Sequence, residues 1–243
     1  RMLELHNREQ FETFAFHYGV DNGDEYNLRM RNSFDHFINV SQMSDNDIAE
    51  FAFENKIDIA IEFNGFMTDA RPGILAYHPA PIQINFLAYP GTMGPGLHEY
   101  IIGDKIIIPE EQKANYSENI IYLPNNYIPQ DNTRQISDKL ITRADCGLPE
   151  SGFVFCCFNT SFKISPAEFD IWMRLLSKVE GSVLWLLKTN KWAEANLKNE
   201  AIHRGIDPER LVFAEMLPPD EHLKRLKLAN LFLDTFNFNA HTT

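Results

Sequence analysis

Residues 152–187 read GFVFCCFNTSFKISPAEFDIWMRLLSKVEGSVLWLL, and this stretch decides the fold class. It holds an apolar run at 153–158, an amphipathic segment that begins at Ser165-Pro166, and a second apolar run at 182–187. Proline suits the first helical position. A strand, a helix and a strand in this order predict a right-handed βαβ unit on a parallel sheet. The apolar face of the predicted helix consists of Phe169, Trp172, Met173 and Leu176.

The same alternation extends in both directions along the chain. Toward the C-terminus we expect helices at 192–204 and 220–228 and strands at 211–214 and 231–234. Toward the N-terminus we expect a helix at 45–55, capped by Ser44, and strands at 57–63, 82–87, 100–108 and 120–123. Apolar periodicity is lost in the polar stretch between these two series. The sequence therefore predicts an α/β protein with an N-terminal lobe at 1–123, a linker at 124–149 and a C-terminal lobe at 150–243.

Composition narrows the class of partner. The chain has 243 residues, 44% of them hydrophobic, and a net charge of −12, from 34 acidic and 22 basic side chains. This balance argues against nucleic acid or an anionic membrane as a partner, although a local positive site could still bind a small anion. No apolar stretch approaches the roughly 18 residues that a membrane span requires. The three cysteines, Cys146, Cys156 and Cys157, suggest reduced thiols in a cytoplasmic protein.

Three loops that follow strands of the C-terminal lobe carry candidate ligand-binding groups. Lys163 follows the first strand, His222 and Arg225 follow the strand at 211–214, and residues 241–243 (His-Thr-Thr) follow the last. Ligands of open parallel sheets bind at the carboxyl ends of the strands. Cations, hydroxyls and backbone N–H groups suit a diphosphate, whereas imidazole and guanidinium suit a nucleobase. Taken singly, each group could equally be a surface residue or a helix cap.

The N-terminal lobe contains the run HPAPIQINFLAYPGTMG at 78–94, which spacing alone would also allow to be plain architecture. No His or Cys cluster has the spacing of a zinc site. A P-loop, a GxGxxG fingerprint and a Gly-x-Ser-x-Gly elbow are also missing from the sequence, which argues against kinase-like, dinucleotide-binding and hydrolase functions.

The run at 78–94 resembles the PAPIQ…LGYPGT signature of the protein O-GlcNAc transferase family, glycosyltransferase family 41. Further family segments follow in order along essentially the whole chain: YIIGD at 100–104, YSE at 116–118, GLPE at 147–150, SVLWLL at 182–187, EH at 221–222 and HTT at 241–243. The resemblance implies a GT-B fold, with two Rossmann-like lobes that are both incomplete here. It also implies a metal-independent, inverting transfer of GlcNAc from UDP-GlcNAc to Ser or Thr hydroxyls of proteins, with no further cofactor.

The resemblance also assigns roles to individual residues. Lys163 would contact the diphosphate and stabilise the leaving UDP, a role that a metal fills elsewhere. His222 would stack on the uracil, and Arg225 would contact it. The remaining binding residues would be Thr160 near the phosphates, His241, Thr242 and Thr243 at the diphosphate and sugar, and Leu87, Ala88 and Pro90 along the sugar pocket.

Two departures from the family pattern leave the donor open. Ala88 replaces the glycine of LGYPGT and adds a methyl group beside the sugar, and Pro219 stands where some members have a ribose-contacting lysine. Family members also carry an upstream strand and helix and a tetratricopeptide array, so we expect this chain to be a fragment that does not turn over alone. The alternatives are the same fold with GDP-fucose, as in the SPINDLY branch, or UDP-glucose, and a non-catalytic module that binds nucleotide or protein.

Overall fold

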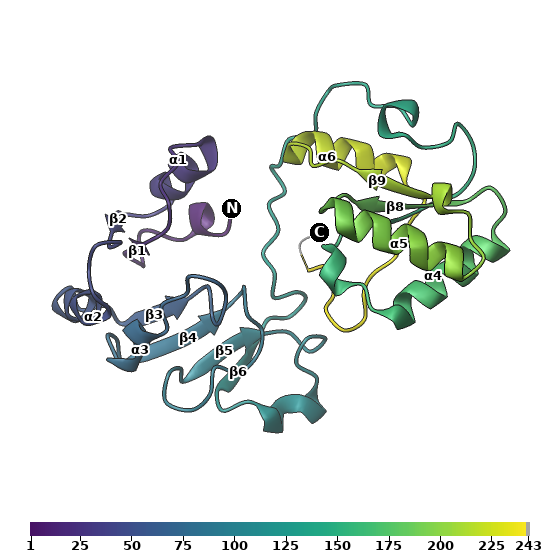
Figure 1. Cartoon of the computed structure of the whole chain (residues 1–243). Coiled ribbons are helices and arrows are strands. Elements are labelled where there is room, and N and C mark those ends of the chain that lie inside the picture. The colour runs from purple at the N-terminus through teal and green to yellow at the C-terminus, as the bar shows by residue number, and fades with distance from the viewer. Residues whose placement is uncertain (242–243) are drawn as a thin grey trace. The chain divides into compact units, whose positions relative to one another are not determined.

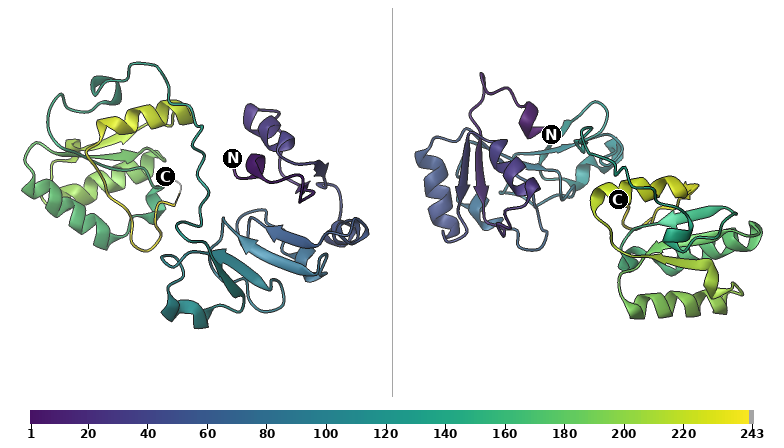
Figure 2. Two further views of the ribbon diagram at one scale, coloured as in Figure 1. Left: turned by 180° about the vertical axis from the view of Figure 1, so that it is seen from behind. Right: turned by 90° about the horizontal axis from the view of Figure 1, so that it is seen from above.

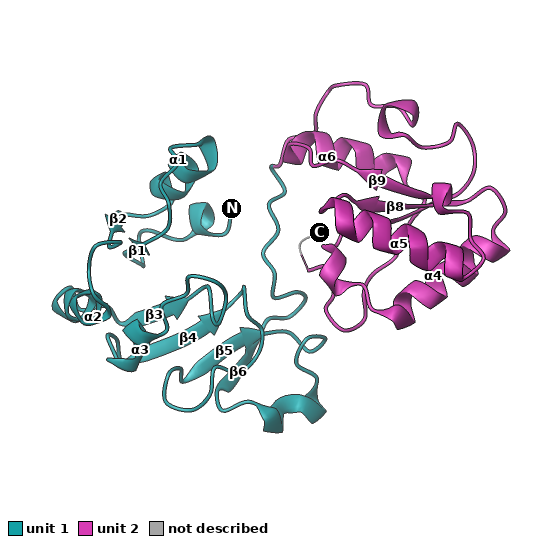
Figure 3. Ribbon diagram, in the orientation of Figure 1, with its two compact units in different colours: residues 1–133 teal, residues 134–243 magenta. Residues whose placement is uncertain are grey.

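The computed structural model of the chain describes residues 1–241 and divides into two compact units, Arg1–Thr133 and Arg134–Thr243 (Figure 3). The division falls within the stretch that the sequence analysis predicts as a linker, 124–149. Strands of the two units lie in separate sheets, and every strand pairing is parallel. The α/β fold class predicted from the sequence is thus present in each unit. Among the described residues, no helix is both long and apolar enough to cross a bilayer.

Unit 1 contains a four-stranded parallel sheet in the order β3-β4-β5-β6 and a separate parallel pair, β1-β2 (Figure 1). The helix α2 starts where it does because Ser44 and Asp47 form a reciprocal capping box. The strands are β1 (Phe14–His17), β2 (His36–Asn39), β3 (Ile59–Glu62), β4 (Ile82–Phe86), β5 (Tyr100–Gly103) and β6 (Asn119–Tyr122). The helices are α1 (Glu25–Asn32), α2 (Asp45–Glu54) and α3 (Gly73–Ala76), with 3₁₀ helices at Leu3–Leu5 and Glu110–Asn115.

Unit 2 has a single sheet in the order β10-β7-β8-β9, so the last strand of the chain lies beside the first strand of the unit. Within this unit, α4 and α5 lie on one face of the sheet and α6 on the other (Figure 2). The strands are β7 (Val154–Cys157), β8 (Val183–Leu187), β9 (Leu211–Ala214) and β10 (Leu231–Phe232). The helices are α4 (Pro166–Lys178), α5 (Lys191–His203) and α6 (Pro219–Arg225), with 3₁₀ helices at Ala144–Cys146, Ser161–Lys163, Pro208–Arg210 and Leu226–Leu228.

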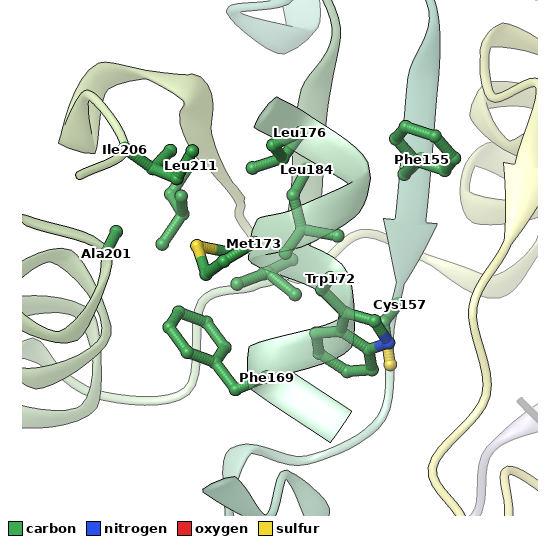
Figure 4. Packing of buried hydrophobic residues seen from close by; sticks show 11 residues of the cluster. Phe155, Cys157, Phe169, Trp172, Met173, Leu176, Leu184, Ala201, Ile206 and Leu211 are labelled. Atoms are coloured by element: carbon green, nitrogen blue, oxygen red, sulfur yellow. The ribbon is translucent and has the colours of Figure 1, made fainter. Parts of the chain in front are cut away.

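Alternation along β7 divides the core of unit 2 into two layers. Phe155 and Cys157 pack toward α4, whose buried face supplies the four apolar residues predicted from the sequence (Figure 4). Cys156 and its alternate neighbours face the other layer, around Trp185. Successive strand residues point to opposite faces of a sheet, so the two adjacent cysteines cannot reach one another. All three cysteines are free thiols.

These thiols differ in their expected reactivity. Burial raises the pKa of Cys156 to about 12 and that of Cys157 to about 11, whereas Cys146 is only half-buried. Because the thiolate is the reactive form, we expect an alkylating reagent at neutral pH to label Cys146 first in the folded protein. Labelling of all three is expected after denaturation without reductant. Rapid native labelling of Cys156 or Cys157, identified by peptide mass spectrometry, would contradict this packing.

Some predicted boundaries are wrong, each for a local reason. The strand expected at 100–108 ends at Gly103, because Asp104 turns the chain by accepting backbone hydrogen bonds from Ile106 (2.8 Å) and Ile107 (3.0 Å). The helix expected at 220–228 is α-helical only to Arg225 and ends as a 3₁₀ turn. The strand expected at 231–234 ends at Phe232, and the Leu233 N–H makes one further hydrogen bond to the Cys156 carbonyl (2.7 Å). The elements β1, α1, β2 and α3 were not predicted.

Candidate functional site

Lys163 lies just beyond the carboxyl end of β7, at the end of a short 3₁₀ helix. Its Nζ donates a hydrogen bond to the carbonyl oxygen of Asn239 (2.9 Å) and sits 3.9 Å from the centroid of the Phe238 ring. These contacts join the loop after β7 to the loop after β10, as expected for neighbouring parallel strands. Thr160 is exposed immediately before this 3₁₀ helix.

The loop after β10 is held by a carboxylate and an amide that the sequence analysis did not assign to the site. Asp234 Oδ1 accepts hydrogen bonds from Asn159 Nδ2 (3.0 Å) and from the backbone N–H of Ala240 (2.9 Å). The buried hydroxyl of Thr235 donates to the carbonyl oxygen of Phe238 (2.6 Å). The loop is therefore an ordered structure with its own internal bonds. The available signal for Asn159 and Asp234 was a polar side chain directly after an apolar run, at 153–158 and 231–233 respectively.

Glu168 anchors the same loop from the first turn of α4. Glu168 is only 1% exposed, and its carboxylate accepts hydrogen bonds from the backbone N–H groups of Phe236 (2.7 Å) and Ser165 (3.0 Å). The Ser165 hydroxyl also donates to it. Burial alone would raise the pKa of Glu168, but the backbone hydrogen bonds outweigh burial and lower the pKa below its ordinary value. One carboxylate thus caps α4 and fixes the loop after β10.

His222 and Arg225 form a fixed pair on α6. Arg225 is 3% exposed; its guanidinium donates to the Glu215 carbonyl (2.6 Å) and to His222 Nδ1 (3.0 Å). The His222 ring meets the Phe158 ring edge-on at 5.0 Å between centroids. Burial, followed by the charge of Arg225, lowers the pKa of His222. Since arginine can only donate, Nδ1 accepts and the hydrogen of the neutral ring resides on Nε2.

A cavity of about 300 Å³ lies beside His222. Its walls are mainly apolar and aromatic, with Asn230 as the other polar contributor. Apolar and aromatic walls with a single imidazole are suited to a planar heterocycle. The lining residues are Cys156, Phe158, His222, Leu226, Ala229, Asn230, Leu231 and Phe232.

A second cation at this sheet edge was missed by the sequence analysis. Lys188 follows β8 directly and forms an exposed ion pair with Glu215, which raises the pKa of Lys188. The neighbouring Thr189 hydroxyl lies 2.9 Å from that of Ser161, so the loops after β7 and β8 are also in contact. Lys188 therefore has its charge neutralised by a carboxylate, whereas no carboxylate within residues 1–241 pairs with Lys163.

His241 closes the described part of the loop. It has a left-handed backbone (φ +58°), and its exposed ring meets Phe238 edge-on at 5.9 Å. Thr242 and Thr243, which the sequence analysis also assigned to the donor site, lie outside the described residues.

In unit 1, Leu87, Ala88 and Pro90 lie in one loop after β4. Leu87 adopts φ +92°, a conformation that costs a residue with a side chain on the order of 1–3 kcal/mol. Ala88 N–H donates to the Phe63 carbonyl (3.3 Å), and the Tyr116 hydroxyl donates to the Pro90 carbonyl (2.9 Å). Strain of this kind persists only where the surroundings hold it.

Tyr89 of this loop is packed closely between two glycines. A Cβ built on Gly65, which has φ +58°, would collide with Cβ of Tyr89. A Cβ on Gly91 would lie 2.9 Å from the Tyr89 ring, and the Phe66 ring meets the same ring edge-on at 5.5 Å. Both glycines are thus required by the position of one side chain.

The described residues contain no cluster of three or more His, Cys, Asp or Glu side chains arranged to hold a metal ion. One Asp-x-Asp sequence does occur, at the start of α2. Its first carboxylate, Asp45, pairs with Arg71 (2.5 Å), and its second, Asp47, belongs to the capping box. Both carboxylates are therefore engaged in structural contacts.

Comparison with known proteins covers the whole chain. A family model described as glycosyl transferase family 41 matches residues 2–141 and 129–243. A probable UDP-N-acetylglucosamine–peptide N-acetylglucosaminyltransferase SEC from Arabidopsis thaliana is 35% identical over 98% of this chain, which spans 25% of that relative. The corresponding Caenorhabditis elegans transferase is 24% identical over 98% of this chain, which spans 30% of it. The chain is thus much shorter than these relatives.

The fold is shared with a solved structure. A Thermobaculum terrenum O-GlcNAc transferase, in its K341M mutant form, matches 98% of this chain with a TM-score of 0.86 at 23% identity, and the chain spans 45% of it. This match confirms the predicted GT-B type of α/β fold. The family model covers both units, including the loops after β4, β7 and β10, and this chain accordingly belongs to glycosyl transferase family 41.

Proposed function

We propose that the full-length protein transfers GlcNAc from UDP-GlcNAc to Ser or Thr hydroxyls of proteins, with inversion and without a metal. The observation that carries the proposal is the convergence of Lys163, His222 and the loop ending at His241 at the carboxyl ends of the unit 2 strands. The names of the family relatives support the donor and the peptide acceptor.

The state of Lys163 fits a diphosphate site. Its contacts in the structure are a neutral carbonyl and an aromatic ring, and no carboxylate within residues 1–241 forms an ion pair with it. A donor diphosphate would therefore meet a cation whose charge is uncompensated. As the glycosidic bond breaks, negative charge grows on the leaving UDP, and a fixed cation stabilises this charge more than the ground state.

The neutral His222 ring fits the nucleobase end of the donor. Its flat face and the adjoining apolar cavity offer stacking, and Nε2–H offers one hydrogen bond donor. Arg225 would support His222 rather than contact the base, because it is buried and already bonded to His222. Thr160, His241, Thr242 and Thr243 complete the proposed donor site of unit 2, and Leu87, Ala88 and Pro90 would contact the sugar.

The test is a transfer assay on the full-length protein with a protein acceptor and three separate donors: UDP-GlcNAc, UDP-glucose and GDP-fucose. We expect incorporation of GlcNAc, detected by intact mass. Transfer from one of the other two donors alone would show that the donor assignment is wrong. Binding of UDP without transfer from any donor would favour a non-catalytic module.

We also propose a cytoplasmic location, based on the three free thiols, since reducing compartments keep cysteines unpaired. Fluorescence microscopy of the tagged full-length protein would reveal a secreted or membrane location instead.

A further inference from the structure

Two buried polar side chains fix the loop of residues 87–94. Asn85, the fourth residue of β4, is 0% exposed, and its Nδ2 donates to the carbonyl oxygens of Tyr89 (3.2 Å) and Gly91 (3.1 Å). These bonds hold the part of the loop that follows the strained Leu87. The amide thus acts from the strand below the loop.

The other end of the loop is held by Glu118, which directly precedes β6 and is 5% exposed. Its Oε1 accepts the backbone N–H of Met93 (2.7 Å), and its Oε2 accepts the hydroxyl of Thr92 (2.7 Å). The Thr92 hydroxyl in turn accepts the N–H of Gly94 (3.1 Å). A single carboxylate therefore determines the course of three consecutive residues.

We infer that Asn85 and Glu118 are positioning residues for the donor sugar: they hold the loop at 87–94 in its strained conformation before any ligand arrives. This inference rests on the proposed role of that loop in binding the donor. Neither side chain would touch the substrate, and each acts through the loop backbone. A loop that is already ordered loses less conformational freedom on binding, so it binds its ligand more tightly.

A close comparison within β4 separates positioning from ordinary core stabilisation. Gln83 lies two residues before Asn85, on the same face of the strand, and is also 0% exposed. Its Nε2 likewise donates to two backbone carbonyls, those of Leu75 (3.1 Å) and Leu97 (2.6 Å). Gln83 therefore makes the same kind of buried contact without touching the loop.

The kinetic experiment compares Asn85→Leu with Gln83→Leu in the full-length protein. Both changes remove a buried amide, and both are expected to lower thermal stability. With Asn85→Leu we expect the donor KM to rise by about tenfold or more while the acceptor KM stays unchanged, since misplaced binding groups cost activity even at a distance. With Gln83→Leu the donor KM should remain near that of wild type. Equal donor KM values in the two variants would overturn the inference.

A second pair of variants tests Glu118 without relying on activity. In Glu118→Gln, the remaining oxygen can still accept from Met93 N–H, and the new amide can donate to the Thr92 hydroxyl. In Glu118→Ala, both contacts are lost. Hydrogen–deuterium exchange should therefore quicken at residues 92–94 in Glu118→Ala and remain slow in Glu118→Gln and in Gln83→Leu.

This exchange measurement distinguishes two kinds of failure. If the wild-type protein transferred no sugar but Glu118→Ala loosened the loop, the proposed function would be wrong, whereas Glu118 would still be shown to hold the loop. If exchange at 87–94 were the same in wild type, Asn85→Leu and Glu118→Ala, the positioning role would be wrong whatever the donor.

Discussion

Replacing Lys163 with alanine in the full-length protein is expected to lower kcat for sugar transfer by about a hundredfold or more, the usual loss when a charge-stabilising group is removed. The reason is that no carboxylate within the described residues pairs with Lys163, whose amine contacts the loop after β10. Stabilisation of a leaving diphosphate increases as the bond breaks, so the loss falls on kcat rather than on binding. Steady-state kinetics with varied donor concentration would measure it.

Two other replacements provide the comparison. His222→Ala removes stacking that is present in both the ground state and the transition state, so it should mainly raise the donor KM. Lys188→Ala removes a cation from the same sheet edge whose charge is already paired with Glu215, and its effect should be small. If Lys163→Ala kept wild-type turnover, or if Lys188→Ala lost as much, Lys163 would not be the group that stabilises the leaving UDP.

Replacing Glu168 with alanine should produce the largest loss of stability. The change removes the buried carboxylate that accepts the N–H of Phe236, and with it the capping box of α4. A hydrogen bond to a charged group contributes about 1.5–3 kcal/mol and a helix cap about 1 kcal/mol, so we expect a loss of about 3 kcal/mol. For a chain of this size, that lowers the melting temperature by about 6–12 °C, measurable by calorimetry.

The matched control for this change is Glu194→Ala. Glu194 also lies in the first turn of its helix, α5, but its contact is a 3.9 Å ion pair with Lys198 at the surface. Its loss should cost about 0.5 kcal/mol or less. A similar fall in melting temperature for both variants would show that Glu168 does not anchor the loop after β10.

The same contacts give a pH dependence. The pKa of Glu168 is lowered in the folded state from an ordinary value of 4.5, so its carboxylate contributes stability above that pH. This contribution is lost as the pH falls through the folded-state pKa. The difference in unfolding free energy between wild type and Glu168→Ala should therefore narrow below about pH 4.5. If the difference in unfolding free energy did not change with pH below about 4.5, the stabilisation by Glu168 would come from packing and not from its charge.

Much of the fold could be predicted because local patterns are strong where the core is dense. The βαβ segment at 152–187 was predicted to within a residue at most boundaries, since its apolar runs and its Ser165-Pro166 start are clear. By contrast, β2 contains His36 and Asn39 at its ends and offers no apolar alternation.

Some features of the candidate site could likewise be predicted from the sequence, and others could not. The position of Lys163 beside the loop after β10 follows from parallel topology, which strand order and the βαβ rule make predictable. The burial of Arg225 could not be predicted, because it depends on the rings of Phe158 and Trp185, far away in sequence. Glu118 and Glu168 were missed for a similar reason: each acts on a loop that is distant in sequence. Asn85 was missed because the course of the loop that follows it could not be predicted, although that loop is only four to six residues away.

The strand order of unit 2 has a consequence for how the protein opens. The pairing of β7 with β8 joins Val154 to Val183, whereas the pairing of β7 with β10 joins Phe155 to Leu231. The pairing with β10 therefore closes a far longer loop of chain, and it does so through only two paired residues. Closing a longer loop costs more chain entropy, and such late, lightly paired segments have the lowest local stability. Fraying of β10 would release Lys163 from Asn239 while the β7-β8-β9 core stayed intact. Such local opening would free the Lys163 amine without unfolding the rest of unit 2.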